Sequence, residues 1–354
     1  MIRALAFLLA LTLAGCASEP VTAQPTLDGK PPIVIAHRGA SGERPEHTLA
    51  SYRLAIELGA DFIEPDLVLT KDGVLVARHE NEISGTTDVT DHPEFAGRKA
   101  TKTIDGQEVT GWFTEDFTLA ELKTLRAKER LPQLRGTAHD GEYEIPTFAE
   151  ILDLLVAVNK GRAKPVGVYP ETKHPGYFVS IGLPHEGPLL AILDQYGYRG
   201  RAAPVFIQSF EVANLKAIRA KSDLSLIQLM DGEGGPADDP KTSYAVMASP
   251  AGLKAVAAYA DGIGPNKSMI IPRNALGMLG YPTALVRDAH AAGLKVHPWT
   301  FRRENYFLPL GDKGGVNPAG HGDLAGEIRA YLATGIDGLF SDNPREAVPA
   351  AAGR

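Results

Sequence analysis

IVIAHRGASG, residues 33–42, decides the fold class of this 354-residue chain. It reads as a short buried strand, Ile33–Ala36, that runs directly into polar residues and glycine. It lacks the G-x-G-x-x-G spacing of the phosphate turn that usually follows the first strand of an open doubly wound sheet. Helical stretches separate this strand from seven further β-rich runs: Phe62–Leu69, Val166–Tyr169, Val205–Gln208, Leu224–Leu229, Gly262–Gly264, Leu294–Pro298 and Ile336–Phe340. Because alternating strands and helices indicate a parallel sheet, and eight such units make a closed barrel, we predict an α/β chain folded as a (β/α)8 TIM barrel. The open doubly wound sheet is the alternative.

The spacing of the helices marks one unit as unusual. Helices are predicted at residues 47–59, 148–158, 186–196, 211–221, 249–260, 283–292 and 322–333. Residues 80–146, after the second strand, contain turn residues, charges and one clear helix around 118–128. An insertion in a βα loop lies over the C-terminal mouth, where barrel enzymes build their sites. We therefore expect one barrel domain, residues 33–350, with a cap insertion at about 80–117 after the second strand.

The composition is that of a globular chain. Hydrophobic residues make up 44% and charged residues 22%, and the formal net charge is −7. These values fit a chain that buries a core, and they exclude disordered and collagen-like classes. A mildly acidic chain without a basic block is a poor match to nucleic acid, so no nucleic-acid partner is predicted.

The N-terminus, MIRALAFLLALTLAGC, predicts export. One cation, Arg3, precedes an apolar run that is shorter than the roughly 20 residues of a membrane span. The run ends at Cys16, the only cysteine, in a context that resembles a bacterial lipobox. We therefore expect a signal peptide at residues 1–15, a lipid on Cys16 and a tether at 16–32. The protein would be an exported, membrane-anchored lipoprotein that faces the periplasm or cell surface. An ordinary signal peptide with an incidental cysteine is the alternative.

Polar residues fall at the ends of the predicted strands, which converge on one mouth in a barrel. Strand two carries Glu64 and Asp66, two residues apart and therefore on the same face, and strand three ends at Glu171. Clustered carboxylates repel one another unless a cation lies between them. Without thiolates, this all-oxygen set favours one divalent cation, Ca²⁺ or Mg²⁺, and zinc with histidine ligands is a further alternative.

A hairpin after strand two bears on His79. Asp72-Gly73 between apolar runs predicts a two-residue turn, which would pair Lys71 with Val74 and set His79 opposite Asp66. That register directs His79 towards the carboxylates. A three-residue turn would shift the register by one and direct it to the other face.

The remaining strand-end residues suit attack at phosphorus. His37, at the end of strand one, and His79 can act as acid and base in one displacement. Arg38 and Lys173 supply fixed positive charges for a phosphate. Gln208, at the end of strand four, is a candidate hydrogen-bond partner of the substrate. Trp299, after strand seven, either stacks on the substrate or packs at the rim.

The chain resembles the glycerophosphodiester phosphodiesterase family, and its exported bacterial branch in particular. The shared motifs are His37-Arg38-Gly39, Pro45-Glu46-His47-Thr48, Glu64-x-Asp66, Thr70-Lys71-Asp72-Gly73, His79, Tyr169–Lys173, Tyr259–Pro265 and Val296–Thr300. The resemblance implies a metal-dependent hydrolase that splits deacylated phospholipids into sn-glycerol 3-phosphate and an alcohol. It also places Ca²⁺ ahead of Mg²⁺ as the metal. It makes His37 and His79 the acid–base pair, Glu64, Asp66 and Glu171 the metal ligands, and Arg38 and Lys173 the phosphate contacts.

Two positions depart from the family pattern, and two other functions stay open. His47 stands where the family often has Asn, and Glu80 stands where it usually has Asp after the second histidine. A barrel phospholipase that acts on intact lipids would use the same residues but would need exposed aromatic side chains at its mouth. A non-catalytic surface lipoprotein that binds a ligand is the third possibility. We expect the remaining histidines outside strand seven to lie on the surface: His92, His139, His174, His185, His290 and His321.

Overall fold

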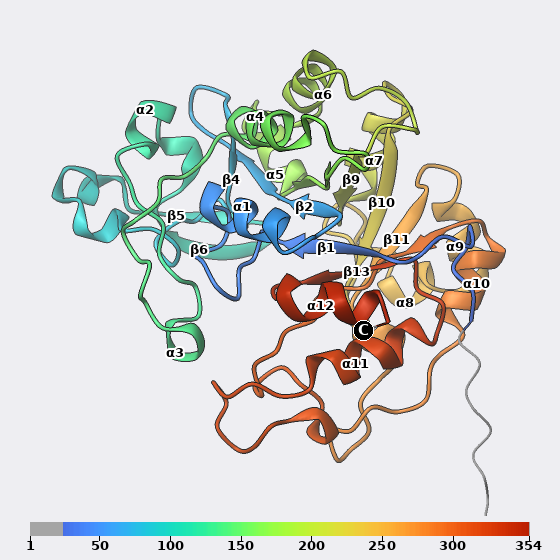
Figure 1. Cartoon of the computed structure of the whole chain (residues 1–354). Coiled ribbons are helices and arrows are strands. Elements are labelled where there is room, and N and C mark those ends of the chain that lie inside the picture. Colours follow the sequence, from blue (N-terminus) through green and yellow to red (C-terminus); the bar gives the residue numbers. More distant parts are fainter. Residues whose placement is uncertain (1–23, 354) are drawn as a thin grey trace, which may run out of the picture.

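The computed structural model describes residues 24–353, which form a mixed α/β body (Figure 1). Eight parallel strand positions run around its centre. The second position is split into two strands, and so is the third. In chain order the strands are β1 (Ile33–His37), β2 (Phe62–Glu64), β3 (Asp66–Leu69), β7 (Gly167–Val168), β8 (Glu171–Thr172), β9 (Phe206–Ser209), β10 (Ser225–Met230), β11 (Gly262–Pro265), β12 (Lys295–Val296) and β13 (Gly338–Ser341).

These strands close on themselves. Parallel pairing runs β13-β1-β2-β7 in one arc and β12-β11-β10-β9-β8-β3 in the other. A parallel bridge between Val168 and Val205 joins the arcs on one side. On the other side, the Phe340 amide donates to the Pro298 carbonyl at 3.0 Å, and the Phe301 amide donates to the Phe340 carbonyl at 2.8 Å. The predicted (β/α)8 barrel is therefore confirmed.

Two prolines split the second and third strand positions. Pro65 lies between β2 and β3, and Pro170 lies between β7 and β8. A proline has no amide hydrogen for the ladder, so regular pairing stops there. Their carbonyls still accept, Pro65 from the Glu171 amide and Pro170 from the Gln208 amide, both at 2.9 Å. The bends lie next to Glu64, Asp66 and Glu171, the three predicted metal ligands.

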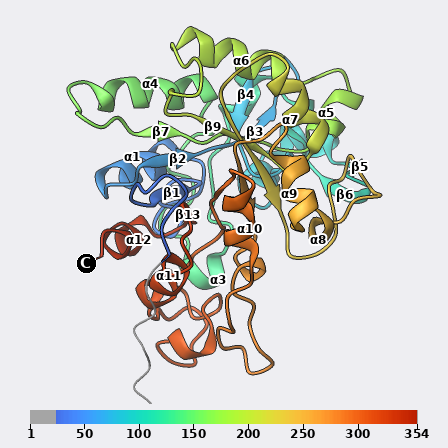
Figure 2. The same cartoon turned by 90° about the vertical axis from the view of Figure 1, so that its right-hand side faces the viewer.

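Helices surround the strands on the outside (Figure 2). All seven predicted helices of the barrel are present, with ends that differ by a few residues. Three further helices, α5, α8 and α12, were not predicted. The barrel helices are α1 (Leu49–Glu57), α4 (Phe148–Asn159), α5 (Pro175–Ser180), α6 (Glu186–Gln195), α7 (Val212–Arg219), α8 (Tyr244–Met247), α9 (Pro250–Val256), α10 (Leu285–Ala291), α11 (Leu324–Leu332) and α12 (Pro344–Ala351). Short 3₁₀ turns lie at η4 (Lys267–Met269) and η5 (Leu310–Asp312). Among the described residues, no helix is both long and apolar enough to cross a membrane.

The hairpin between β3 and β4 (Leu75–Ala77) corrects the predicted turn. Leu69 pairs with Leu75, and the Thr70 amide donates to the Val74 carbonyl at 3.0 Å, so the turn has three residues, Lys71–Gly73. Asp66 therefore lies opposite Arg78 instead of His79. Gly73, the third residue of the turn, has φ +77°, as such turns require. Thr70 selects this form, because its hydroxyl donates to Asp72 and accepts from the Val74 amide. The two-residue turn was therefore wrong.

The segment between β4 and α4, residues 78–147, holds the predicted cap insertion (Figure 1). Phe113 and Phe117 are fully buried within it, so it has an apolar interior. The single helix expected at 118–128 is shorter than predicted and covers only Leu119–Leu122. The elements of this β4–α4 segment are η1 (Val89–Asp91), η2 (Pro93–Arg98), β5 (Ala100–Ile104), β6 (Gln107–Gly111), η3 (Thr114–Asp116), α2 (Leu119–Leu122) and α3 (Pro132–Arg135). The domain bounds stay predictions.

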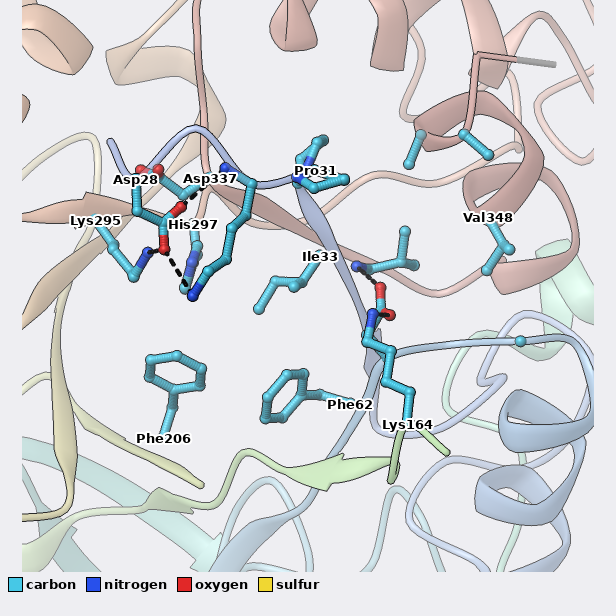
Figure 3. Close-up of a pocket in the computed structure, with 17 residues that line it drawn as sticks. Asp28, Pro31, Ile33, Phe62, Lys164, Phe206, Lys295, His297, Asp337 and Val348 are labelled. Carbon is cyan, nitrogen blue, oxygen red and sulfur yellow. Dashed lines mark hydrogen bonds and ion pairs between the residues drawn. The ribbon is translucent and has the colours of Figure 1, made fainter. Parts of the chain in front are cut away.

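The opposite end of the barrel carries residues 24–32, the described part of the predicted tether. The Gln24 amide donates to the Ala333 carbonyl at 3.1 Å, and the Leu27 amide donates to Asp337 at 2.7 Å. A cavity of about 510 Å³ lies beside this segment, at the first residues of β1, β2, β9 and β12 (Figure 3). Its charged rim is internally paired, since Lys295 contacts Asp28 and Lys164 contacts Asp61. We therefore assign this cavity no ligand.

Candidate active site

A pocket of about 340 Å³ lies at the C-terminal ends of the barrel strands. Its walls include eight of the nine residues that the sequence predicts as functional. The ninth, Asp66, lies fully buried beneath it. The lining residues are His37, Arg38, Glu64, His79, Glu171, Lys173, Gln208, Phe210, Leu229, Asp231, Trp299, Thr300, Arg302 and Phe340.

Three buried carboxylates form the floor of the pocket. Glu64, Asp66 and Glu171 each offer an oxygen, and these oxygens lie within 4.8 Å of one another. The Arg38 amide and the Gln208 side chain donate to Glu64 at 2.8 and 3.1 Å. Asp66 Oδ2 accepts from His47 at 2.9 Å, whereas Asp66 Oδ1 is buried and has no partner. One cation at this point would satisfy that oxygen.

The electrostatics of the floor also fit a cation. Burial and the charges of Asp66 and Glu171 raise the pKa of Glu64 well above its usual range. Burial also raises the pKa of Glu171, to about 8, although Lys173 opposes the shift. A bound cation would relieve this repulsion between the buried carboxylates. Oxygen donors of this kind suit Ca²⁺ or Mg²⁺.

His37 stands on one side of the floor, at the end of β1. Its Nδ1 lies 2.6 Å from Asp342 Oδ1. Because an ionised carboxylate only accepts, Nδ1 carries the proton, and Nε2 is left free for chemistry. Burial and the charge of Arg38 lower the pKa of His37 to about 4, so the ring is neutral at pH 7.

His79 also lines this pocket. Its Nδ1 bonds to Glu80, and its Nε2 lies 3.3 Å from Lys173 Nζ. β4 ends at Ala77, and the Arg78 amide makes the last bond to β3, to the Asp66 carbonyl at 3.0 Å, so His79 lies just past the paired residues and its side chain lines the pocket. Burial, Arg38 and Lys173 lower the pKa of His79 to about 3. His79 is thus at the predicted place, but not through the predicted pairing.

Arg38 and Lys173 bring positive charge to the same pocket. Arg38 has φ 60°, and its Nη1 donates to Glu46 at 2.9 Å. Its Nε lies 3.5 Å from Asp66 and is buried without a hydrogen-bond partner. Lys173 Nζ donates to Glu171 at 2.8 Å. Glu46 therefore holds Arg38, while the carboxylate that orients His37 is Asp342.

An apolar wall faces these charged groups. Trp299 and Phe210 meet edge to face, with ring centroids 5.8 Å apart. The Trp299 indole donates to the Gly264 carbonyl at 2.9 Å, which fixes its orientation. Gln208 keeps one buried oxygen without a partner beside this wall. Trp299 thus both packs at the rim and lines the pocket.

Comparison with known proteins agrees with this geometry. Residues 37–346 match the Glycerophosphoryl diester phosphodiesterase family.

The chain belongs to this family.

Within the glycerophosphoryl diester phosphodiesterase family, a glycerophosphodiester phosphodiesterase of Arabidopsis thaliana is 40% identical over 95% of this chain and 92% of its own length. One from Haemophilus influenzae is 33% identical over 85% of this chain and 87% of its own length.

Solved structures support the fold. A family member from Silicibacter pomeroyi has a TM-score of 0.64 at 22% identity and covers 94% of this chain and 96% of its own. An Oleispira antarctica phosphodiesterase, solved with its product sn-glycerol-3-phosphate, has a TM-score of 0.58 at 22% identity over 92% and 99% of the two chains. The fold class is confirmed, and so is the enzyme class, a phosphoric diester hydrolase.

Some site residues of this family member escaped the sequence analysis. Asp342, Phe210, Arg302 and Phe340 all lie at or after strand ends, which was the signal used for the predicted residues. Asp342 directly follows β13, so its position at a strand end could have identified it. The prediction for His185 was wrong. It is fully buried and bonds the Leu67 carbonyl at 3.1 Å, because it lies where the turn before α6 packs on β3.

Proposed function

We propose that the protein hydrolyses glycerophosphodiesters, which are deacylated phospholipids, to sn-glycerol 3-phosphate and an alcohol in a reaction that requires a divalent cation. The observation that carries this proposal is the pocket itself. Two carboxylate-bonded histidines and three clustered carboxylates lie at one pocket, in a chain of this family. The named activity of the 40%-identical Arabidopsis relative supports the same substrate class.

Glu64, Asp66 and Glu171 would hold the cation, with Ca²⁺ ahead of Mg²⁺. The bound cation would offset charge on a phosphate oxygen as the transition state forms. Arg38 and Lys173 lie beside the carboxylates and would bind the other phosphate oxygens. Phosphoryl transfer depends mainly on such positioning and charge neutralisation.

The histidines would move the protons. One Nε2 accepts the proton of the attacking oxygen, which belongs to water or to the substrate's own glycerol hydroxyl, as the new P–O bond forms. The other histidine takes up a proton on Nε2 when the anionic phosphate binds, and gives it to the leaving alcohol oxygen as that P–O bond breaks. Where the glycerol hydroxyl attacks, water then opens the cyclic phosphate. Asp342 and Glu80 keep each ring oriented with Nδ1 protonated, so that Nε2 faces the phosphate. Gln208 and Trp299 would contact the organic part of the substrate.

Hydrolysis of intact membrane lipids is less well supported. A phospholipase of this kind would expose aromatic side chains of the cap at its mouth. Phe95, Phe113 and Phe117 are instead buried, and the Trp112 indole bonds the Phe95 carbonyl at 2.7 Å. A purely ligand-binding role has no specific observation in its favour.

We also propose that the protein is exported, anchored by a lipid on Cys16, and related to the exported bacterial branch of the family. The support is the apolar N-terminal run that ends in the only cysteine. Cys16 lies outside the described residues. The test is incorporation of labelled fatty acid by the full chain and by Cys16→Ser. Equal labelling of the two chains would refute the anchor.

The activity is tested by release of glycerol 3-phosphate from glycerophosphocholine. The form that lacks residues 1–16 is assayed with Ca²⁺, with Mg²⁺ and with chelator, beside His37→Ala and Glu64→Gln. His321→Ala, a change at an exposed histidine, is the matched control. We expect metal-dependent release that both site variants lose and the control keeps. A folded protein that releases nothing with either metal would refute the proposal.

A further inference from the structure

The β4–α4 segment reaches into the site through two arginines. Arg130 follows α2, and Arg135 is the last residue of α3, five positions along the chain. Each binds a carboxylate that bonds one of the two histidines. Neither arginine lines the pocket, so neither contacts the reacting groups directly.

Arg130 joins two carboxylates. Its Nε and Nη2 donate to Glu46 at 2.8 and 2.7 Å, and its Nη1 and Nη2 donate to Glu80 at 3.0 and 2.6 Å. Two of these four carboxylate oxygens also bind residues of the site. Glu46 Oε2 also accepts from Arg38, and Glu80 Oε1 also bonds His79 Nδ1. One guanidinium therefore fixes both Arg38 and His79.

Arg135 acts in the same way on the other histidine. Its Nη2 donates to Asp342 Oδ2 at 2.6 Å, while Asp342 Oδ1 bonds His37. Its Nε donates to Glu304 at 2.6 Å, which anchors the guanidinium. Arg302 donates to the same Asp342 oxygen at 2.7 Å, so Asp342 has two cationic partners. Among the described residues, Arg130 is the one cation that pairs with Glu80.

We propose that Arg130 and Arg135 are positioning residues, through which the β4–α4 segment holds both histidines of the proposed reaction in their working orientation. Arg130 suits this role because its planar fork binds Glu46 and Glu80 through two hydrogen bonds each. Arg135 binds Asp342 through Nη2 alone, and Glu304 holds its Nε. A carboxylate held on both oxygens cannot rotate, and it keeps the imidazole it bonds in one tautomer. The β4–α4 segment is then part of the catalytic apparatus, and the inference rests on the proposed two-histidine reaction.

The test compares Arg130→Met and Arg135→Met in the full chain. Arg98→Met is the matched control, because Arg98 lies in the same segment and binds Glu121 through two nitrogens, away from the pocket. We expect kcat per folded molecule to fall about 10- to 100-fold for Arg130→Met, which is typical for loss of such an orienting contact. Arg135→Met should lose less, because Arg302 remains on Asp342. A kcat within about twofold of wild type in Arg130→Met would overturn the proposal.

A double-mutant cycle separates positioning from folding. In a Glu80→Gln background, Arg130→Met removes no further charge pair from His79, so its effect on kcat should shrink to the part that passes through Glu46 and Arg38. Equal effects in the two backgrounds would show that Arg130 does not act through Glu80. Arg130→Lys, which keeps the charge but not the fork, should recover part of the lost kcat.

A second readout needs no turnover. In ¹⁵N-histidine spectra, the His79 ring, identified by its loss in His79→Gln, should show a single Nδ1–H tautomer in the wild type and a mixture in Arg130→Met. Unchanged spectra would refute the proposal. If the wild type hydrolyses no glycerophosphodiester, the proposed function fails, and the spectra still decide whether Arg130 orients His79.

Discussion

Replacement of Asp342 by asparagine tests the His37 side of the site most directly. Asp342 Oδ1 lies 2.6 Å from His37 Nδ1, and the carboxylate fixes the proton on that nitrogen. An asparagine amide can donate to Nδ1 instead, which would move the ring proton to Nε2, the nitrogen that faces the phosphate. Loss of an orienting partner costs about 10- to 100-fold, and a wrong tautomer costs up to about 10⁴-fold in a hydrolytic triad. We therefore expect kcat of Asp342→Asn to fall by about 10²- to 10⁴-fold, or about 3–5 kcal/mol of barrier.

The same change also lowers stability. Removing one partner of a buried ion pair costs about 3–5 kcal/mol. Here Arg135 keeps Glu304 and Arg302 is partly exposed, so we expect the lower end of that range. The assay is glycerol 3-phosphate release per folded molecule, with urea unfolding in parallel.

Asp337→Asn provides the matched control. Asp337 accepts from the Leu27 and Val296 amides at the opposite end of the barrel, far from the pocket. This variant should lose stability and keep kcat. If Asp342→Asn keeps kcat within about threefold while it remains folded, the tautomer argument is refuted.

Three other predictions follow from the same geometry. Because the pKa of Glu171 is raised, the cation-free fold binds more protons between pH 6.5 and 8 than the unfolded chain does. Its free energy of unfolding should therefore fall as pH rises through this range. Ca²⁺ should bind more tightly over the same range, as Glu171 loses its proton. Thermal unfolding with chelator and with Ca²⁺, in wild type and Glu171→Gln, checks this, and an equal pH slope in the two proteins would contradict it. Gly39→Ala should lower the free energy of unfolding in urea by about 2–4 kcal/mol, because Gly39 has φ +86° and a Cβ would lie 2.4 Å from Ser51 Oγ. Gly73→Ala should lower it by about 1 kcal/mol, because Gly73 has φ +77° but open space around it. Lys173→Met should lower kcat/KM about 10- to 100-fold, as expected for loss of a charged hydrogen bond to the phosphate. Steady-state kinetics measure this change, and an unchanged kcat/KM would show that Lys173 does not bind the phosphate.

The barrel and most of the site were predictable from local pattern. Strand ends of a barrel meet at one mouth, so His37, Glu64 and Glu171 could be grouped from their positions alone. The two residues Glu64 and Asp66 share a face because strand side chains alternate. These rules depend on short-range sequence and on a topology that many chains share.

The parts that were missed depend on contacts between distant residues. Arg130 meets Glu80 across 50 positions, and Asp342 meets His37 across 305, so no local spacing links either pair. The turn after β3 was decided by a single hydroxyl, on Thr70, between two turn types that differ by one residue. His185 is buried because a loop packs on the Leu67 carbonyl, and its local sequence is as polar as that of an exposed turn.

The docking of residues 24–32 has a consequence for how the enzyme faces its surroundings. Gln24 lies where the strands begin, and the catalytic mouth lies where they end. With the lipid that we propose on Cys16, the end of the barrel where the strands begin would lie towards the bilayer, and the catalytic mouth would point away from it. Such an orientation favours dissolved diesters, which reach the mouth from the surrounding water. It disfavours intact lipids, which stay in the bilayer at the other end of the barrel.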